Sequence, residues 1–115
     1  ENTANMLKSQ FEKILNKHQL DYDINWEHSG EPYLTETGVL VNSLSDAINQ
    51  VSGIKPIVST TGGTSDGRFI SKICDQIVEF GPINKSIHKI NENVNVDDIE
   101  TLKDIYKLTI SKILK

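Results

Sequence analysis

The feature that most constrains the fold of this chain is an alternation, after Pro32, between stretches with helical periodicity and short apolar runs. Two runs, KPIVST at 55–60 and DQIVEF at 75–80, are bounded by glycine or proline and are typical of buried strands. The stretch DGRFISKIC at 66–74 lies between them and predicts a helix. Because a strand, a helix and another strand in succession favour parallel pairing, residues 32–115 are expected to form an α/β arrangement.

Two longer helices are expected on either side of these runs. The first should end at Gly53, since glycine suits the left-handed position that follows a helix, and its apolar stripe comprises Leu40, Leu44, Ala47, Ile48 and Val51. The last should begin at Asn95 or Asp97, whose side chains can cap a first turn, and its apolar stripe comprises Ile99, Leu102, Tyr106, Ile110 and Ile113. Both stripes predict amphipathic helices that pack on a core.

The first 31 residues show a different pattern. Apolar residues recur at helical spacing over residues 3–18, which predicts one amphipathic helix. The run DYDINWE at 21–27 then alternates polar and apolar residues, as does a strand that is covered on one face only. Gly30 and Pro32 break this pattern. We therefore expect one domain segment at 1–31 and a second at 32–115.

Charge and composition exclude several classes of partner. The 115 residues carry a formal net charge of -4, and the lysines are spread along the predicted helices, which argues against binding of nucleic acid. No apolar run approaches the ~20 residues that span a bilayer, so no membrane partner is expected. The single cysteine, Cys74, cannot form an internal disulfide, which fits a cytoplasmic protein.

The stretch STTGGTSDGRFI has the composition of a binding loop. It would join the C-terminal end of a strand to the N-terminus of a helix, where free N–H groups and the helix dipole favour an anion. Gly62 and Gly63 would let a ligand approach the backbone, and Thr64 and Ser65 could donate hydroxyl hydrogen bonds. The alternative is a tight turn in which Asp66 caps the helix. No Walker or dinucleotide fingerprint is present, so a nucleotide site is not expected.

A second long loop, EFGPINKSIHKINENVNVDD at 79–98, follows the next predicted strand. Loops of this length in a small domain are usually functional or mobile. His88 lies at its centre, with polar neighbours that include Asn84. One imidazole does not make a metal site, because zinc takes three or four ligands and the chain has neither H-E-x-x-H nor paired cysteines. The alternative to a ligand is an ordinary exposed histidine.

Three stretches together carry a family resemblance: INWEHSGEPYLT, TTGGTSDGRFI and VEFGPINKSIHKINENVNVDDIETL. They closely resemble the C-terminal part of the succinyl-diaminopimelate desuccinylases, a branch of the di-zinc metallopeptidases that also include acetylornithine deacetylases and aminoacylases. Both motifs occur in the family's order and at its spacing, so the resemblance covers nearly the whole chain. It implies the C-terminal part of a zinc-exopeptidase-like catalytic domain at 32–115. It also implies that 1–31 are the last helix and strand of an α+β lid or dimerisation domain.

The resemblance also implies an activity and roles for individual residues. Enzymes of this family hydrolyse N-succinyl-LL-2,6-diaminopimelate to succinate and LL-2,6-diaminopimelate, in bacterial lysine and diaminopimelate biosynthesis. They are homodimers and hold two zinc ions in each active site, with cobalt able to substitute. His88 matches a zinc ligand, and Gly63, Thr64 and Asn84 match positions that contact the substrate.

One departure from the family limits what this chain is expected to do alone. The other metal ligands and the general-base glutamate of the family come from an N-terminal segment, and this chain begins at Glu1, which suggests a piece of a longer protein. We therefore expect no catalytic residue here and no activity of the isolated chain. The alternatives are another zinc-dependent N-acyl-amino-acid deacylase, an isolated binding or dimerisation module, and an anion-binding regulatory domain.

Overall fold

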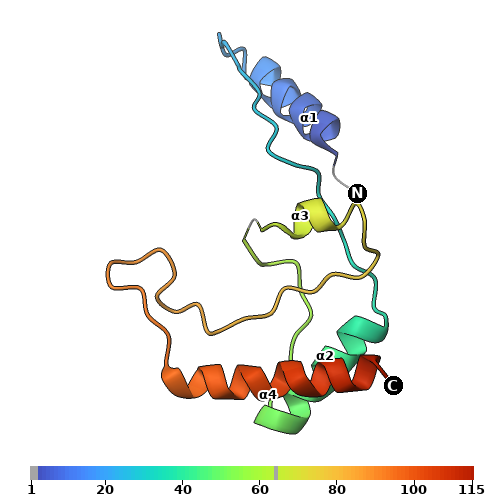
Figure 1. Cartoon of the computed structure of the whole chain (residues 1–115). Helices are drawn as coiled ribbons and strands as arrows, with labels where there is room; N and C mark the ends of the chain where they lie inside the picture. The colour runs from blue at the N-terminus through green and yellow to red at the C-terminus, as the bar shows by residue number, and fades with distance from the viewer. Residues whose placement is uncertain (1–2, 64) are drawn as a thin grey trace. The chain divides into compact units, whose positions relative to one another are not determined.

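The computed structural model describes residues 3–63 and 65–115, and the regular structure of these residues is entirely helical (Figure 1). The helices of the described part are α1 (Ala4–Lys17), α2 (Val39–Ser52), α3 (Gly67–Ile70) and α4 (Val96–Ile113). The chain divides into two compact units, the first ending at Leu34 and the second beginning at Thr35. None of the described helices combines the length and the apolar character that crossing a bilayer requires.

The three long helices begin and end close to the expected residues. The Thr3 hydroxyl accepts a hydrogen bond from the Met6 N–H at 3.2 Å, and the Asn95 side chain accepts one from the Asp97 N–H at 3.2 Å. Gly53, directly after α2, adopts a left-handed φ of 72°. The caps predicted at Gly53 and Asn95 are confirmed, because caps depend on residues that are close in sequence. The Thr3 cap was not predicted.

The N-terminus of α2 is capped by a residue that is distant in sequence. Gly38 precedes the helix and offers no side chain, and the Gln76 Oε1 instead accepts a hydrogen bond from the Leu40 N–H at 2.9 Å. The neighbouring Ile77 N–H donates to the Thr35 hydroxyl at 3.1 Å. The segment 75–80 is thereby attached to the start of α2.

The core of the second unit lies between α2 and α4, which pack against each other (Figure 1). Its buried apolar residues are Leu44, Ala47, Ile48 and Ile105, with Val78, Phe80 and Leu108 packed around them. The Tyr106 hydroxyl donates to the Phe80 carbonyl, and the two rings meet edge to face with centroids 5.9 Å apart. The segment 75–80 therefore completes the core although it forms no regular element.

The expected apolar face of α4 is not the face that packs on α2. Ile105 and Thr109 are the buried residues of this helix, whereas Ile99 and Ile110 are 52% and 56% exposed. The expectation was wrong because α4 carries apolar residues on two sides, and periodicity alone does not say which side meets α2.

The three predicted strands are also absent from the described residues. The segments 21–27, 55–60 and 75–80 are neither helical nor paired, although 75–80 lies against the core. A strand exists only where a second backbone supplies the N–H and C=O groups of a ladder, and no described segment does so here. The described residues therefore form an all-helical arrangement, and the strands of the expected α/β class are not confirmed among them. The helix expected at 66–74 shrinks to the single turn of α3.

In the first unit, the expected strand folds back on α1 instead of joining a sheet. The Trp26 ring meets Phe11 edge to face at 5.7 Å, and its indole N–H donates to the Glu12 carboxylate at 3.2 Å. The Lys8 ammonium lies 5.8 Å from the centre of the same ring. Trp26 therefore packs against α1. The alternating pattern predicted such packing for one face of 21–27.

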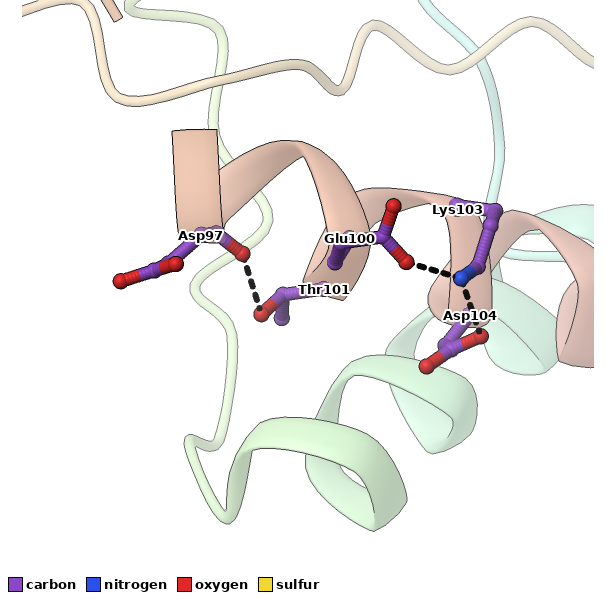
Figure 2. A network of polar contacts seen from close by, with 5 residues as sticks. All are labelled: Asp97, Glu100, Thr101, Lys103 and Asp104. Atoms are coloured by element: carbon purple, nitrogen blue, oxygen red, sulfur yellow. Dashed lines mark hydrogen bonds and ion pairs between the residues drawn. The ribbon is translucent and has the colours of Figure 1, made fainter. Parts of the chain in front are cut away.

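The exposed surface of α4 carries a local polar network (Figure 2). Lys103 pairs with Glu100 and lies 3.7 Å from an Asp104 carboxylate oxygen, while the Thr101 hydroxyl donates to the Asp97 carbonyl at 3.2 Å. The hydrogen bond to Glu100 and the nearby carboxylates raise the pKa of Lys103 above its ordinary value. Because these groups are exposed, their contribution to stability is small.

Candidate functional site

The glycine-rich loop ends in a turn that is too short to act as the expected helix N-terminus. α3 spans only Gly67–Ile70, so few aligned peptide dipoles lie behind the loop. The Asp66 side chain makes no capping hydrogen bond. The expectation that the Asp66 side chain caps this helix is therefore wrong, and the helix behind the predicted anion site is a single turn.

Ser65 connects the glycine loop to the segment that leads into the second loop. Its hydroxyl oxygen accepts a hydrogen bond from the Gly67 N–H at 3.0 Å, and its O–H donates to the Glu79 carboxylate. Ser65 is thus committed to partners within the chain. Sequence reasoning missed Glu79; the signal was an acid inside an otherwise apolar run that immediately precedes Gly81 and Pro82.

The two glycines of the loop differ in what surrounds them. A Cβ built on Gly62 would lie 3.6 Å from the second carboxylate oxygen of Glu79, whereas a Cβ on Gly63 would have no atom within 4 Å. The backbone of Gly63 is therefore open to an incoming group. Thr64, the neighbouring residue expected to contact substrate, lies outside the described residues.

The electrostatics of the loop include a negative charge that the sequence did not indicate. The Glu79 carboxylate lies beside Gly62 and Ser65, where an anionic ligand was expected. Arg68 is close in sequence, but its guanidinium stacks over the Phe69 ring at 4.7 Å and its Nε is buried without a hydrogen-bond partner. The Glu79 carboxylate would repel an anionic ligand at this loop, so binding of such a ligand would need a positive charge from elsewhere.

The second loop is closed by hydrogen bonds at its base. The Ser86 hydroxyl donates to the Asn93 carbonyl at 2.6 Å and accepts from the Asn93 N–H at 3.0 Å. We refer to this pair of hydrogen bonds as the Ser86 clasp. Asn84 lies just before it, and its carbonyl accepts from the Ile87 N–H at 3.2 Å.

His88 lies inside the closed loop in an uncommon backbone conformation. Its φ is 59°, in the left-handed region, as is that of Asn91 at 62°. Asparagine and histidine are enriched in this region among non-glycine residues, yet the conformation costs about 1–2 kcal/mol for an L-residue. The His88 side chain is exposed and is joined by no hydrogen bond or ion pair to another residue of 3–63 or 65–115.

No cluster of metal-binding side chains surrounds His88 within the described residues. Nowhere in 3–63 or 65–115 do three or more histidine, cysteine, aspartate or glutamate side chains come close enough to hold one metal ion. The arrangement can present a single imidazole and an open glycine backbone, and it can offer the amide of Asn84. Each of these groups can bind, but none is placed to activate water.

Comparison with known proteins agrees with the motifs. The model of peptidase family M20/M25/M40 matches residues 5–112. A protein of Nitrosomonas eutropha named succinyl-diaminopimelate desuccinylase is 56% identical over 112 residues, and proteins of the same name from Methylobacillus flagellatus and Bordetella avium are 56% and 51% identical. These alignments cover 97–98% of this chain. The chain spans about 30% of the length of these relatives.

Proposed function

The chain belongs to peptidase family M20/M25/M40, and on this basis we propose that it forms part of an enzyme that hydrolyses N-succinyl-LL-2,6-diaminopimelate to succinate and LL-2,6-diaminopimelate. The observation that supports this most is the identity of 56% over 97% of the chain to a protein named succinyl-diaminopimelate desuccinylase. Because the chain spans only 30% of that relative, the activity belongs to a larger assembly of residues. A zinc-dependent deacylase with another acyl preference is the second reading, which the assay below separates from the first.

His88 is proposed as one ligand of the zinc pair that the family implies, with cobalt able to substitute for zinc. The imidazole fits this role because it is exposed, belongs to a loop closed by the Ser86 clasp, and has no competing partner among the described side chains. A catalytic zinc requires three protein ligands. The rest would have to come from outside the residues described here.

The proposed roles in catalysis follow from what each group can bind. Zinc, held by His88 and by ligands from elsewhere, would supply Lewis-acid chemistry at the amide carbonyl. Proton transfer would fall to the general-base glutamate expected elsewhere. His88 would take part as a neutral imidazole, holding the metal through one ring nitrogen. The open backbone of Gly63, together with Thr64 and the Asn84 amide, would orient the carboxylates of the substrate.

The proposal also includes the three strands that were expected from the sequence and that the described residues do not form. We expect 55–60 and 75–80 to pair in a sheet of the catalytic domain, 32–115, and 21–27 to pair in the lid or dimerisation domain, 1–31. Support comes from exposed apolar side chains on 55–60, where Ile57 is 91% exposed and Val58 67% exposed. Such residues fit a strand that is buried once its neighbours are present. The enzyme is proposed to be a cytoplasmic homodimer.

The test is release of succinate from N-succinyl-LL-2,6-diaminopimelate with zinc present. Three proteins are compared: this chain alone, a chimera in which this chain replaces the matching 112 residues of the N. eutropha relative, and the chimera with His88→Ala. We expect activity in the chimera only. A folded chimera that hydrolyses other N-acyl amino acids but not this substrate would favour the second reading, and an active His88→Ala chimera would exclude His88 as a required ligand.

A further inference from the structure

We propose that Glu79 is a positioning residue for the glycine loop, which it holds through Ser65 so that the backbone of Gly63 is presented to the substrate. This inference rests on the proposed function, because it takes Gly63 as a substrate contact. It goes beyond that function by giving a role to a carboxylate that acts on the loop and not on the substrate.

The Glu79 carboxylate contacts the glycine loop at two points. One of its oxygens accepts a hydrogen bond from the Ser65 O–H, and the other lies 3.6 Å from the position that a Cβ on Gly62 would take. The Ser65 Oγ in turn accepts a hydrogen bond from the Gly67 N–H at 3.0 Å. A single carboxylate therefore contacts the loop on both sides of Gly63, and through one hydroxyl it is linked to the start of α3.

The residues on either side of Glu79 attach it to the core. Val78 and Phe80 pack against the buried cluster of α2 and α4, and the Phe80 carbonyl accepts a hydrogen bond from the Tyr106 hydroxyl. Both neighbours are half-buried, whereas Glu79 is exposed. The backbone of Glu79 is thus held by the core while its carboxylate reaches outward to the loop.

The glycine loop has little structure of its own to hold it in place. Its described residues, 59–63 and 65, belong to no helix or strand, and the 2.8 Å contact between the Ser59 and Thr61 hydroxyls lies within the loop. The hydrogen bond to Glu79 instead joins the loop to a residue 14 positions away. Because a hydrogen bond to an ionised carboxylate is about twice as strong as one between neutral groups, this bond is suited to fix the loop on the core.

Loss of the carboxylate should therefore weaken substrate binding more than it weakens folding or slows the chemical step. Without Glu79, the backbone of Gly63 is no longer held where the substrate approaches it. A contact that is equally strong in the bound substrate and in the transition state changes KM and leaves kcat unchanged. Since Glu79 is exposed and is not part of the buried cluster of α2 and α4, the thermal midpoint should change little.

Two measurements test the inference, one on this chain and one on the N. eutropha chimera. In this chain, Glu79→Ala should speed amide hydrogen exchange at Gly67 about 10-fold, because the Ser65 hydroxyl loses its anchor. In the chimera, Glu79→Ala should raise KM about 10-fold at nearly unchanged kcat. Glu79→Gln keeps an acceptor oxygen and should stay within about threefold of the unsubstituted chimera. Asp75→Ala is the matched control, because it removes an exposed acid from the same segment, 75–80, and it should change neither measurement.

Ser65→Ala breaks the same hydrogen bond from the other side. It should raise KM as Glu79→Ala does, and the double variant should be no worse than either single variant, because both substitutions remove one shared interaction. Should Glu79→Ala lower the thermal midpoint strongly, Ser65→Ala provides the second test. Effects of the two substitutions that simply multiply would show independent roles and overturn the inference.

The outcomes separate this inference from the proposed function. A folded chimera that does not hydrolyse the substrate contradicts the proposed function, and the exchange measurement on this chain still decides whether Glu79 holds the loop. If the chimera is active and Glu79→Ala leaves KM unchanged, the positioning role is wrong and the proposed function stands. An equal rise in KM for Glu79→Gln and Glu79→Ala would also overturn the inference, because it would show that the charge matters and the hydrogen bond does not.

Discussion

At the scale of single residues, Gly62 and Gly63 differ in their surroundings, and this difference bears on which of them could contact a ligand. Gly62 faces the Glu79 carboxylate at ordinary contact distance, and Gly63 faces open space. Neither position has a positive φ, so neither backbone requires glycine. If glycine is needed at Gly63, the reason is the approach of a ligand and not the fold.

We predict that Gly63→Val leaves stability within about 0.5 kcal/mol and raises KM for the substrate in the chimera. The added side chain would stand where the substrate approaches the backbone. Urea unfolding and steady-state kinetics measure the two effects, and Gly81→Val, also without a close neighbour, is the control for a loop glycine outside the proposed contacts. Unchanged KM in Gly63→Val would remove Gly63 from the binding site.

The site residues show how far the sequence could be read at this scale. The sequence identified His88 and the glycine loop through short motifs, but it gave no sign of the Ser86 clasp or of the hydrogen bond between Ser65 and Glu79. Those contacts join residues 7 and 14 positions apart. They depend on how the loops fold back, which neither periodicity nor spacing encodes.

At the scale of elements, the start of α2 depends on Gln76. We predict that Gln76→Ala lowers the free energy of unfolding by about 1–2 kcal/mol, because the Leu40 N–H loses its acceptor in a half-buried position. Gln76→Glu retains an acceptor oxygen and should cost less. Urea denaturation of the three chains measures the difference, and equal stability of Gln76→Ala and the unsubstituted chain would contradict this account of the helix start.

The Lys103 network of α4 predicts a pH dependence of stability. The pKa of Lys103 is raised in the folded chain, mainly by its hydrogen bond to Glu100, so folding favours the protonated amine. The contribution is fully present below the unfolded pKa, about 10.4 for lysine, and is lost as the pH rises through the folded value.

The measurement is the difference in thermal midpoint between the unsubstituted chain and Lys103→Met from pH 8 to 12. The difference should be small, favour the lysine, and close at the alkaline end. Lys107→Met, an exposed lysine of the same helix, is the control for general alkaline effects. A gap for Lys103→Met that widens with pH would contradict the sign.

The helices could be predicted and the strands could not, for a physical reason. A helix satisfies its backbone within one segment, so apolar stripes, with caps at Gly53 and Asn95, were sufficient to predict the helices. A strand needs a partner backbone, and alternation in 21–27 says nothing about whether one is present. The buried face of α4 was predicted wrongly for the same reason, because a helix with two apolar sides needs two packing partners.

At the scale of the whole molecule, the chain buries little of its apolar surface. Its buried apolar residues among those described are Val41, Leu44, Ala47, Ile48 and Ile105. Large side chains on α1, on 55–60 and on the second side of α4 are exposed, among them Phe11 at 49% and Ile110 at 56%. Exposed apolar surface of this extent is typical of interfaces.

We predict that the isolated chain self-associates as its concentration rises and that it binds the dye ANS. The same residues should be covered in the chimera, which should bind less dye per molecule at equal concentration. Light scattering and fluorescence titration measure both properties. A chain that stays monomeric and binds no dye at high concentration would show that these faces need no cover.

We propose that this chain supplies one metal ligand, His88, to an active site completed by other residues. The most direct test of this claim is a crystal structure of the zinc-loaded chimera, with anomalous diffraction measured on both sides of the zinc absorption edge. We predict an anomalous peak about 2.0–2.1 Å from a ring nitrogen of His88, as expected for a zinc–histidine bond. A fully occupied zinc site with His88 turned away from it would contradict the claim.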